Sequence, residues 1–216
     1  MLLVSPNIAR SELLSRITSI IAGFAGTLTL ASCATDGTSG PLSAGSTEQG
    51  VSVGQCPANT PAALAPAADQ DLAFVLNAQG VQRYQCVQST TGFAWTFVAP
   101  DADLFSPHPH QSVVHHFAGP TWLYKDSSSV VGVKTAGVTV DPAAIPWLLL
   151  NVTSHGGAEG RLSDVTSIQR LQTTGGNAPA TGCDADHVGA ESDVLYTARY
   201  FFYRTSNGAH HVRCGG

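Results

Sequence analysis

The feature that most constrains how this chain can fold is the period of its hydrophobic residues. After residue 32 no segment shows a long 3.6-residue apolar repeat, which argues against long amphipathic helices. Short apolar or alternating runs appear instead, separated by turn residues. Two of them, Leu72–Leu76 and Val81–Val87, flank Asn77-Ala78-Gln79-Gly80, where glycine can supply the positive φ of a hairpin turn. We therefore expect an all-β fold, a single-domain β-sandwich or flattened barrel.

The remaining strands can be placed along the chain from the same alternation. They are Ala94–Val98, Val113–Phe117, Thr121–Lys125, Val130–Lys134, Val138–Val140, Ile145–Val152, Thr166–Thr173 and Leu195–Tyr203. Ile145–Val152 is apolar on both faces, so it should lie between two layers, with Trp147 in the core. Alternate residues of the last strand, Tyr196 to Phe202, should share one face.

The first 32 residues have the three-part organisation of an export signal. A basic leader with Arg10 and Arg16 precedes an apolar run, Ile20–Leu30, and small residues lead to Cys33. The run is shorter than the roughly 20 apolar residues that a membrane span needs. We expect residues 1–32 to be a lipoprotein signal peptide, Cys33 to be the lipidated first residue, 33–56 to be a flexible tether and 57–216 to be the β-rich domain. An ordinary signal peptidase site, with Cys33 incidental, is the alternative.

These features predict an exported protein held to the membrane through a lipid anchor. Ala34 follows Cys33, and the absence of an acidic residue at that position favours the outer membrane of a Gram-negative cell. The net charge is −5, and the basic residues are scattered singly, which argues against nucleic acid as a partner.

Four cysteines remain beyond Cys33: Cys56, Cys86, Cys183 and Cys214. Outside the cytoplasm this even number indicates two disulfides, and the spacing leaves all three connectivities open. A zinc site made of these thiols is disfavoured, since the sequence contains no CxxC pair.

A histidine-rich segment, Pro107–His116, is the densest chemical cluster. Imidazole is a common ligand of copper and zinc, so His108, His110 and His116 form a candidate metal site with an open position. His115 would point away from His116 on a strand. The alternative is a surface loop that leads into a strand whose inward histidine is satisfied by the backbone.

Aromatic residues supply a second candidate site. Trp122, Tyr196 and Tyr200 could form a platform for a sugar ring or an apolar ligand, although core packing explains the same residues. Signs of catalysis are weak. Ser154-His155-Gly156-Gly157 lacks the GxSxG elbow, and Asp101 and Asp103 after a proline are more typical of a turn than of an acid and base pair.

Several strings resemble a family shared by exported bacterial proteins and fungi and catalogued as domain of unknown function 3455. They are Gly80–Cys86, His116–Trp122, Ile145–Leu150, Ile168–Arg170, Thr174–Pro179 and Tyr196–Tyr203. They occur in order between about Pro61 and Arg204.

The resemblance implies a disulfide between Cys86 and Cys183, which would leave Cys56 to pair with Cys214. Sequence separation alone would instead favour Cys56 with Cys86 and Cys183 with Cys214. Fungal relatives often carry the automatic name malate dehydrogenase, but the sequence has no GxGxxG after a strand and no βαβ alternation, so no nucleotide cofactor is expected.

Together these observations favour a non-catalytic, membrane-tethered binding module for a glycan or an apolar ligand of the envelope. A histidine-based metal protein, with copper or zinc as cofactor, is the first alternative. A purely structural envelope lipoprotein is the second.

Overall fold

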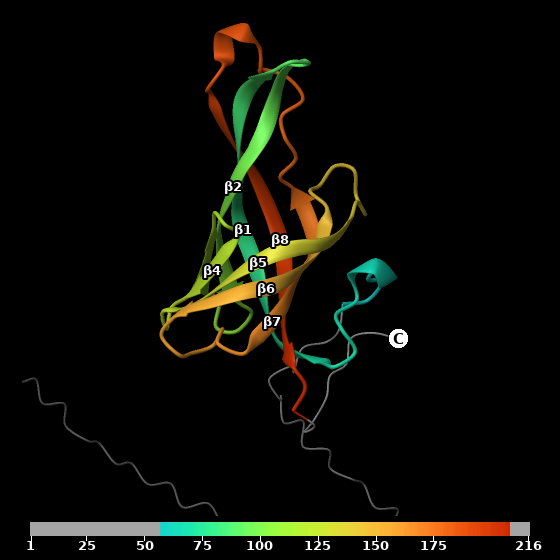
Figure 1. The fold of residues 1–216 in the computed structure, drawn as a ribbon, viewed down its shortest axis with the longest axis vertical. Coiled ribbons are helices and arrows are strands. Elements are labelled where there is room, and N and C mark those ends of the chain that lie inside the picture. Colours follow the sequence, from blue (N-terminus) through green and yellow to red (C-terminus); the bar gives the residue numbers. More distant parts are fainter. Residues whose placement is uncertain (1–56, 208–216) are drawn as a thin grey trace, which may run out of the picture. The chain divides into compact units, whose positions relative to one another are not determined.

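A computed structural model describes residues 57–207, which form an all-β domain (Figure 1). The strands are β1 (Gln70–Ser89), β2 (Gly92–Ser106), β3 (Gln111–Phe117), β4 (Thr121–Tyr124), β5 (Ser128–Val138), β6 (Trp147–Gly157), β7 (Val165–Gly175) and β8 (Glu191–Thr205). Two short 3-10 turns, η1 (Ala62–Leu64) and η2 (Ala185–His187), complete the described elements. The predicted all-β class is confirmed. The predicted signal peptide, Cys33, the tether, Cys56 and Cys214 lie outside the described residues.

All eight strands belong to one closed barrel in which each strand pairs with its neighbours in sequence. Every pairing is antiparallel, and β1 closes the ring by pairing with β8 from Gln70 to Gln85. Closure is the barrel form of the predicted architecture, and it leaves no free edge along most of the sheet.

The predicted hairpin at Asn77–Gly80 is wrong, because β1 runs through these residues without a break. The turn lies further along, between Ser89 and Gly92, and Gly92 has the positive φ of 125°. Gly80 serves a different purpose. A Cβ there would collide with the backbone of Asp101 and Ala102 in β2, so glycine permits the close approach of the two strands.

The short β3–β4 hairpin leaves a gap in the barrel wall. β3 pairs with β2 only over Ala102–Ser106, and β4 pairs with β5 only over Ser129–Val131. Within the described residues, β2 before Ala102 therefore pairs with β1 alone, and β5 after Val131 pairs with β6 alone. The turn between β3 and β4 reaches β5 through one further bond, from the Gly132 amide to the Pro120 carbonyl at 3.1 Å.

Large side chains fill the inside of the barrel. The inward face of β8 contributes Tyr196, Ala198, Tyr200 and Phe202, the alternate residues that the sequence places on one face. Phe201 and Tyr203 point outward, and η1 covers them in a second buried cluster to which Leu64 belongs. Trp147, predicted to be core, packs against this outer cluster. The alternation of β8 thus divides its aromatic residues between two cores.

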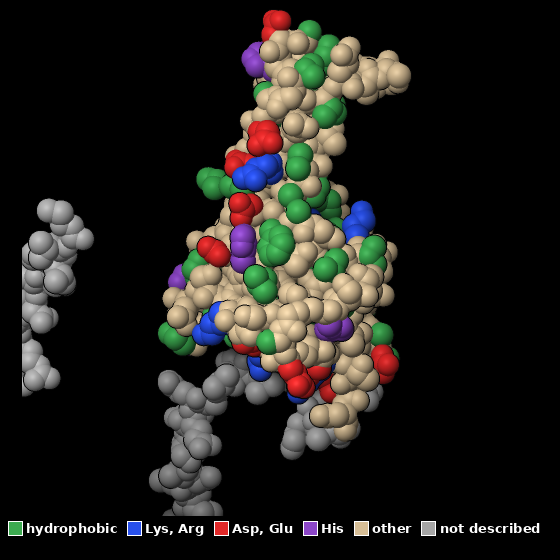
Figure 2. Space-filling view, turned by 60° about the vertical axis from the view of Figure 1, so that its left-hand side comes forward, with side chains coloured by type: hydrophobic (Ala, Val, Ile, Leu, Met, Phe, Trp, Pro, Cys, Tyr) green, Lys and Arg blue, Asp and Glu red, His purple; other side chains and the backbone are tan. Residues whose placement is uncertain are grey.

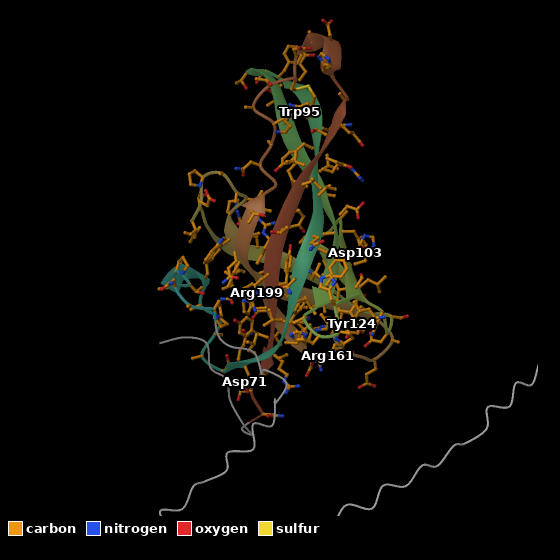
Figure 3. The ribbon with its side chains drawn as sticks, turned by 180° about the vertical axis from the view of Figure 1, so that it is seen from behind. Asp71, Trp95, Asp103, Tyr124, Arg161 and Arg199 are labelled. Atoms are coloured by element: carbon orange, nitrogen blue, oxygen red, sulfur yellow. A yellow bond between two sulfur atoms is a disulfide. The ribbon has the colours of Figure 1, made fainter. Side chains whose placement is uncertain are left out.

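The far end of the β1–β2 hairpin is fastened by a disulfide between Cys86 and Cys183. This is the pairing that the family resemblance implies, and it excludes a bond from Cys86 to Cys56. Cys86 lies opposite Trp95 in the hairpin, and the Trp95 indole donates to the Thr181 carbonyl at 2.9 Å. Figure 3 shows the disulfide beside Trp95. The long segment before β8 is therefore held against the hairpin at two points.

Over residues 57–207, the structure contains no helix with the length and apolar character needed to cross a membrane.

Removing the disulfide should lower stability without changing the fold. The bond joins residues 97 apart in sequence, and closing a loop of this size restricts the unfolded chain. We expect the double variant Cys86→Ser, Cys183→Ser to lose about 2–4 kcal/mol of unfolding free energy in urea denaturation. In reductant, which breaks every disulfide, the wild type and the variant should be equally stable. Equal stability of the oxidised wild type and the oxidised variant would contradict the prediction.

Candidate functional site

A pocket of about 420 Å³ lies at the gap in the barrel wall. Every strand contributes at least one residue to its lining, because the lining is the inside of the closed barrel. The buried floor includes Gln82, His116, Trp122, Leu150, Arg170 and Tyr200. The exposed rim consists of Phe97 and Val98 of β2, Gly119 of the β3–β4 turn, and Val133 and Lys134 of β5. The pocket therefore opens to solvent where β2 and β5 pass the end of the short hairpin.

Three stacked or edge-on rings form one wall of the floor. His116 and Trp122 are register partners in β3 and β4, and their rings stack with centroids 4.3 Å apart. Tyr200 meets both rings edge-on, at 5.4 Å from His116 and 6.0 Å from Trp122. Each contact has the geometry that favours aromatic pairs, so this wall is a rigid, preformed surface.

His116 is neutral in the folded protein. Its Nδ1 lies 2.9 Å from the Thr121 carbonyl, which can only accept, so Nδ1 carries the proton and Nε2 is the acceptor nitrogen. Burial lowers the pKa of His116 from 6.5 to about 3, and the positive charge of Arg170 adds to the shift. At neutral pH this ring is an uncharged aromatic surface.

Three buried nitrogen donors form no hydrogen bond of normal geometry among residues 57–207: Gln82 Nε2, Trp122 Nε1 and Arg170 Nε. The Gln82 amide interacts more weakly with the Tyr196 hydroxyl. All three residues line the same pocket. A second nitrogen of the Arg170 guanidinium, Nη2, donates a hydrogen bond to the Pro146 carbonyl at 2.9 Å. Because most buried polar groups in proteins are paired, three unpaired donors around one cavity make it the strongest candidate site of the domain.

The pocket is also electropositive. Its lining contains Arg170 and Lys134 and no Asp or Glu. Burial raises the pKa of Tyr84, Tyr196 and Tyr200, and in each case the charge of Arg170 opposes that rise. One guanidinium thus dominates the electrostatic environment of the barrel interior.

The histidines proposed as metal ligands are not brought together. His108 and His110 are exposed in the connection between β2 and β3, where His110 stacks on Phe105, whereas His116 is buried in the pocket wall. In residues 57–207 no group of three or more His, Cys, Asp or Glu side chains is arranged to hold a metal ion. The inward histidine is bonded to the backbone, as in the alternative interpretation, and His115 faces away toward Asp101, 3.0 Å from its carboxylate.

The proposed aromatic platform divides between pocket and core. Trp122, Tyr196 and Tyr200 are all buried, with exposed fractions of 1%, 2% and 1%. Trp122 and Tyr200 line the pocket, whereas Tyr196 is a core residue whose hydroxyl lies 3.4 Å from that of Tyr200.

The weak catalytic candidates are engaged elsewhere. Asp101 lies near both His115 and Arg83, and Asp103 accepts a hydrogen bond from Ser112 at 3.1 Å. His155 contacts the Val165 carbonyl at 2.8 Å. None of these side chains lines the pocket.

Gln82 and Arg170 have no assigned role at the level of sequence, although both lie in strings that carry the family resemblance. One signal was present in the sequence. Arg170 is the one charged residue of β7, and this strand proves to be buried from Ser167 to Leu171. A charge in such a strand is uncommon without a partner or a function.

The fold and the pocket define a class: small single-barrel all-β proteins with a preformed interior pocket. Residues 66–204, well over half of the chain, match the family model described as protein of unknown function (DUF3455). The chain belongs to this family. Neither a curated protein nor a solved structure matches the chain.

The buried neutral His116 should make stability depend on pH. Its folded pKa is about 3 and its ordinary value is 6.5, so the unfolded chain takes up this proton first as the pH falls. Stability is then full above about pH 6.5 and is lost between pH 6.5 and 3, by up to about 1.4 kcal/mol per pH unit.

The test is the free energy of unfolding between pH 7.5 and 4.5 for the wild type and His116→Gln. We expect a shallower slope in the variant. His115→Gln controls for the loss of an imidazole from the same strand, and parallel curves for the wild type and His116→Gln would show that His116 is not buried as described.

Proposed function

We propose that this protein is a non-catalytic binding module that takes a small, mainly apolar ligand into its barrel through the opening between β2 and β5. The observation that carries the proposal is the pocket itself, whose walls include residues from all eight strands. Barrels of eight strands are just wide enough to hold one small ligand, and about 420 Å³ lies within the range of small-molecule sites.

The rim supports an apolar ligand. Phe97, Val98 and Val133 are about half exposed, at 49%, 51% and 49%, although each is a large apolar side chain. Figure 2 shows apolar side chains at the surface of the domain, interspersed with charged side chains and histidines. Apolar residues grouped around an opening are typical of a binding site, since a ligand can remove them from water.

The floor supports the same class of ligand over a glycan. Apart from the unpaired donors and Lys134, the lining is aromatic, aliphatic or glycine, with few acceptors to meet sugar hydroxyls. Gly132 keeps the floor open, because a Cβ there would lie 3.2 Å from the Trp122 ring. A larger residue in this position would occupy space that a ligand can use.

The proposed place of action is the cell envelope, with the domain tethered through lipid on Cys33. The support is the signal pattern before Cys33 and the stretch of small and polar residues that follows it. An exported, tethered binding domain would collect its ligand at the membrane surface.

Filling the pocket should weaken the binding of an apolar probe. We expect N-phenyl-1-naphthylamine, a neutral apolar dye, to bind the full-length protein at one site per chain, measured by its fluorescence. Gly132→Val should weaken this binding at least about tenfold, because the new methyl groups enter the pocket beside Trp122.

Gly156→Val is the matched control. Gly156 lies in the adjacent strand β6, outside the pocket, where a Cβ meets only the Ser129 hydroxyl. It should bind the dye as the wild type does. Equal dye binding by folded Gly132→Val and the wild type would contradict the proposal.

The anchor can be tested separately. Cys33→Ala removes the acylated thiol, so we expect the protein to move from the membrane fraction to the soluble fraction and to lose labelling by radioactive palmitate. Labelling that persists in the variant would rule out Cys33 as the lipid attachment site.

A further inference from the structure

We infer that the ligand is an organic acid, bound with its carboxylate inside the barrel at Arg170 and with its apolar body toward the rim. This inference rests on the proposed function and names the chemistry of the ligand. It is carried by the unpaired donors and by the charge balance of the pocket.

Arg170 is the first element of the argument. Its side chain is 9% exposed, and among residues 57–207 it takes part in no ion pair. Arginine does not lose its proton in proteins, so the pocket contains a buried positive charge whose partners among residues 57–207, the Pro146 carbonyl and the Tyr200 hydroxyl, are both neutral. A buried charge without an opposite charge is unfavourable, and an anion in the pocket would remove this penalty.

The donors are the second element. Gln82 Nε2 and Trp122 Nε1 are buried without a hydrogen bond of normal geometry among residues 57–207, and both residues line the same pocket as Arg170. The Gln82 amide also interacts with the Tyr196 hydroxyl, which is a neutral partner. A carboxylate accepts about four hydrogen bonds on two oxygens and bonds well to guanidinium groups. Donors of this kind, with a guanidinium among them, therefore suit a carboxylate.

The charge count favours a carboxylate over other polar ends. Lys134, the second cation, is exposed at the rim, so the floor holds a single positive charge. A doubly charged phosphate would bring one negative charge more than the floor can balance, whereas an alcohol would leave the guanidinium without a counter-charge. Since Phe97, Val98 and Val133 surround the opening, the apolar part of the acid lies toward the rim.

The test compares octanoate with 1-octanol, which have the same chain length and differ in the charged end. In calorimetric titration of the full-length wild type at pH 7, the dissociation constant of octanoate should be at least about tenfold lower than that of octanol. The reason is that a hydrogen bond to a charged group contributes more than a hydrogen bond between neutral groups. In Arg170→Met the two should bind equally. Gln82→Leu should weaken the binding of octanoate more than that of octanol. Lys134→Met, at the rim, should change the ratio of the two affinities least.

The outcomes separate the two proposals. Octanol binding as tightly as octanoate to the wild type overturns the inference about the carboxylate and leaves the apolar pocket standing. Binding of neither ligand, together with no binding of the dye, overturns the proposed function itself. The wild-type comparison decides the inference even where Arg170→Met fails to fold, and retention of the octanoate preference in a folded Arg170→Met would also overturn it.

Discussion

The pairing of β1 with β8 is the interaction on which the rest of this domain depends. It closes the sheet, so the inward residues of all eight strands face one another across a common interior. The aromatic wall of His116, Trp122 and Tyr200 combines residues of β3, β4 and β8. In the ring, β8 is a neighbour of neither β3 nor β4. In an open sheet these side chains would lie on one exposed face, and the buried charge of Arg170 would be in water. Closure creates both the pocket and its electrostatic character.

A second constraint gives this interior access to solvent. The hairpin of β3 and β4 is too short to fill the space between β2 and β5, and its turn ends at Gly119 and Pro120, on the edge of the pocket. The residues of the floor thus lie on strands that are hydrogen-bonded to their neighbours, whereas the opening exists because β3 and β4 are short. Such a site is preformed, which reduces the entropy that a ligand loses on binding and suits a binding module. An acid that entered the pocket would give the buried charge of Arg170 the counter-charge that it lacks among residues 57–207.

Much of the fold could be predicted from the sequence, because alternation is a local signal. The all-β class, most strands and the inward face of β8 were found in this way. The hairpin at Gly80 was misplaced because this glycine is required by the close approach of β2, more than twenty residues away. No local pattern distinguishes a glycine required by such a contact from a glycine in a turn.

Trp122 and Tyr200 were found as aromatic candidates. Gln82 and Arg170 were not, because their importance lies in being buried without a partner, which depends on which strands meet. The histidine-rich segment could not be interpreted from sequence for the same reason: His108 and His110 are exposed and His116 is buried, and residues 57–207 form no cluster arranged to hold a metal ion.

The central claim is that ligand enters the barrel and meets the floor of the pocket, and the indole signals of the three tryptophans test it most directly. In a ¹H–¹⁵N spectrum of the full-length protein titrated with octanoate, the Trp122 indole signal should shift in a saturable way, since Trp122 lines the pocket and its N–H has no hydrogen-bond partner among residues 57–207. The Trp95 signal should stay in place, because that N–H is bonded to Thr181 far along the hairpin. Trp122→Phe assigns the signal. An unmoved Trp122 signal while binding saturates, or an equal shift of Trp95, would place the ligand elsewhere and contradict this account.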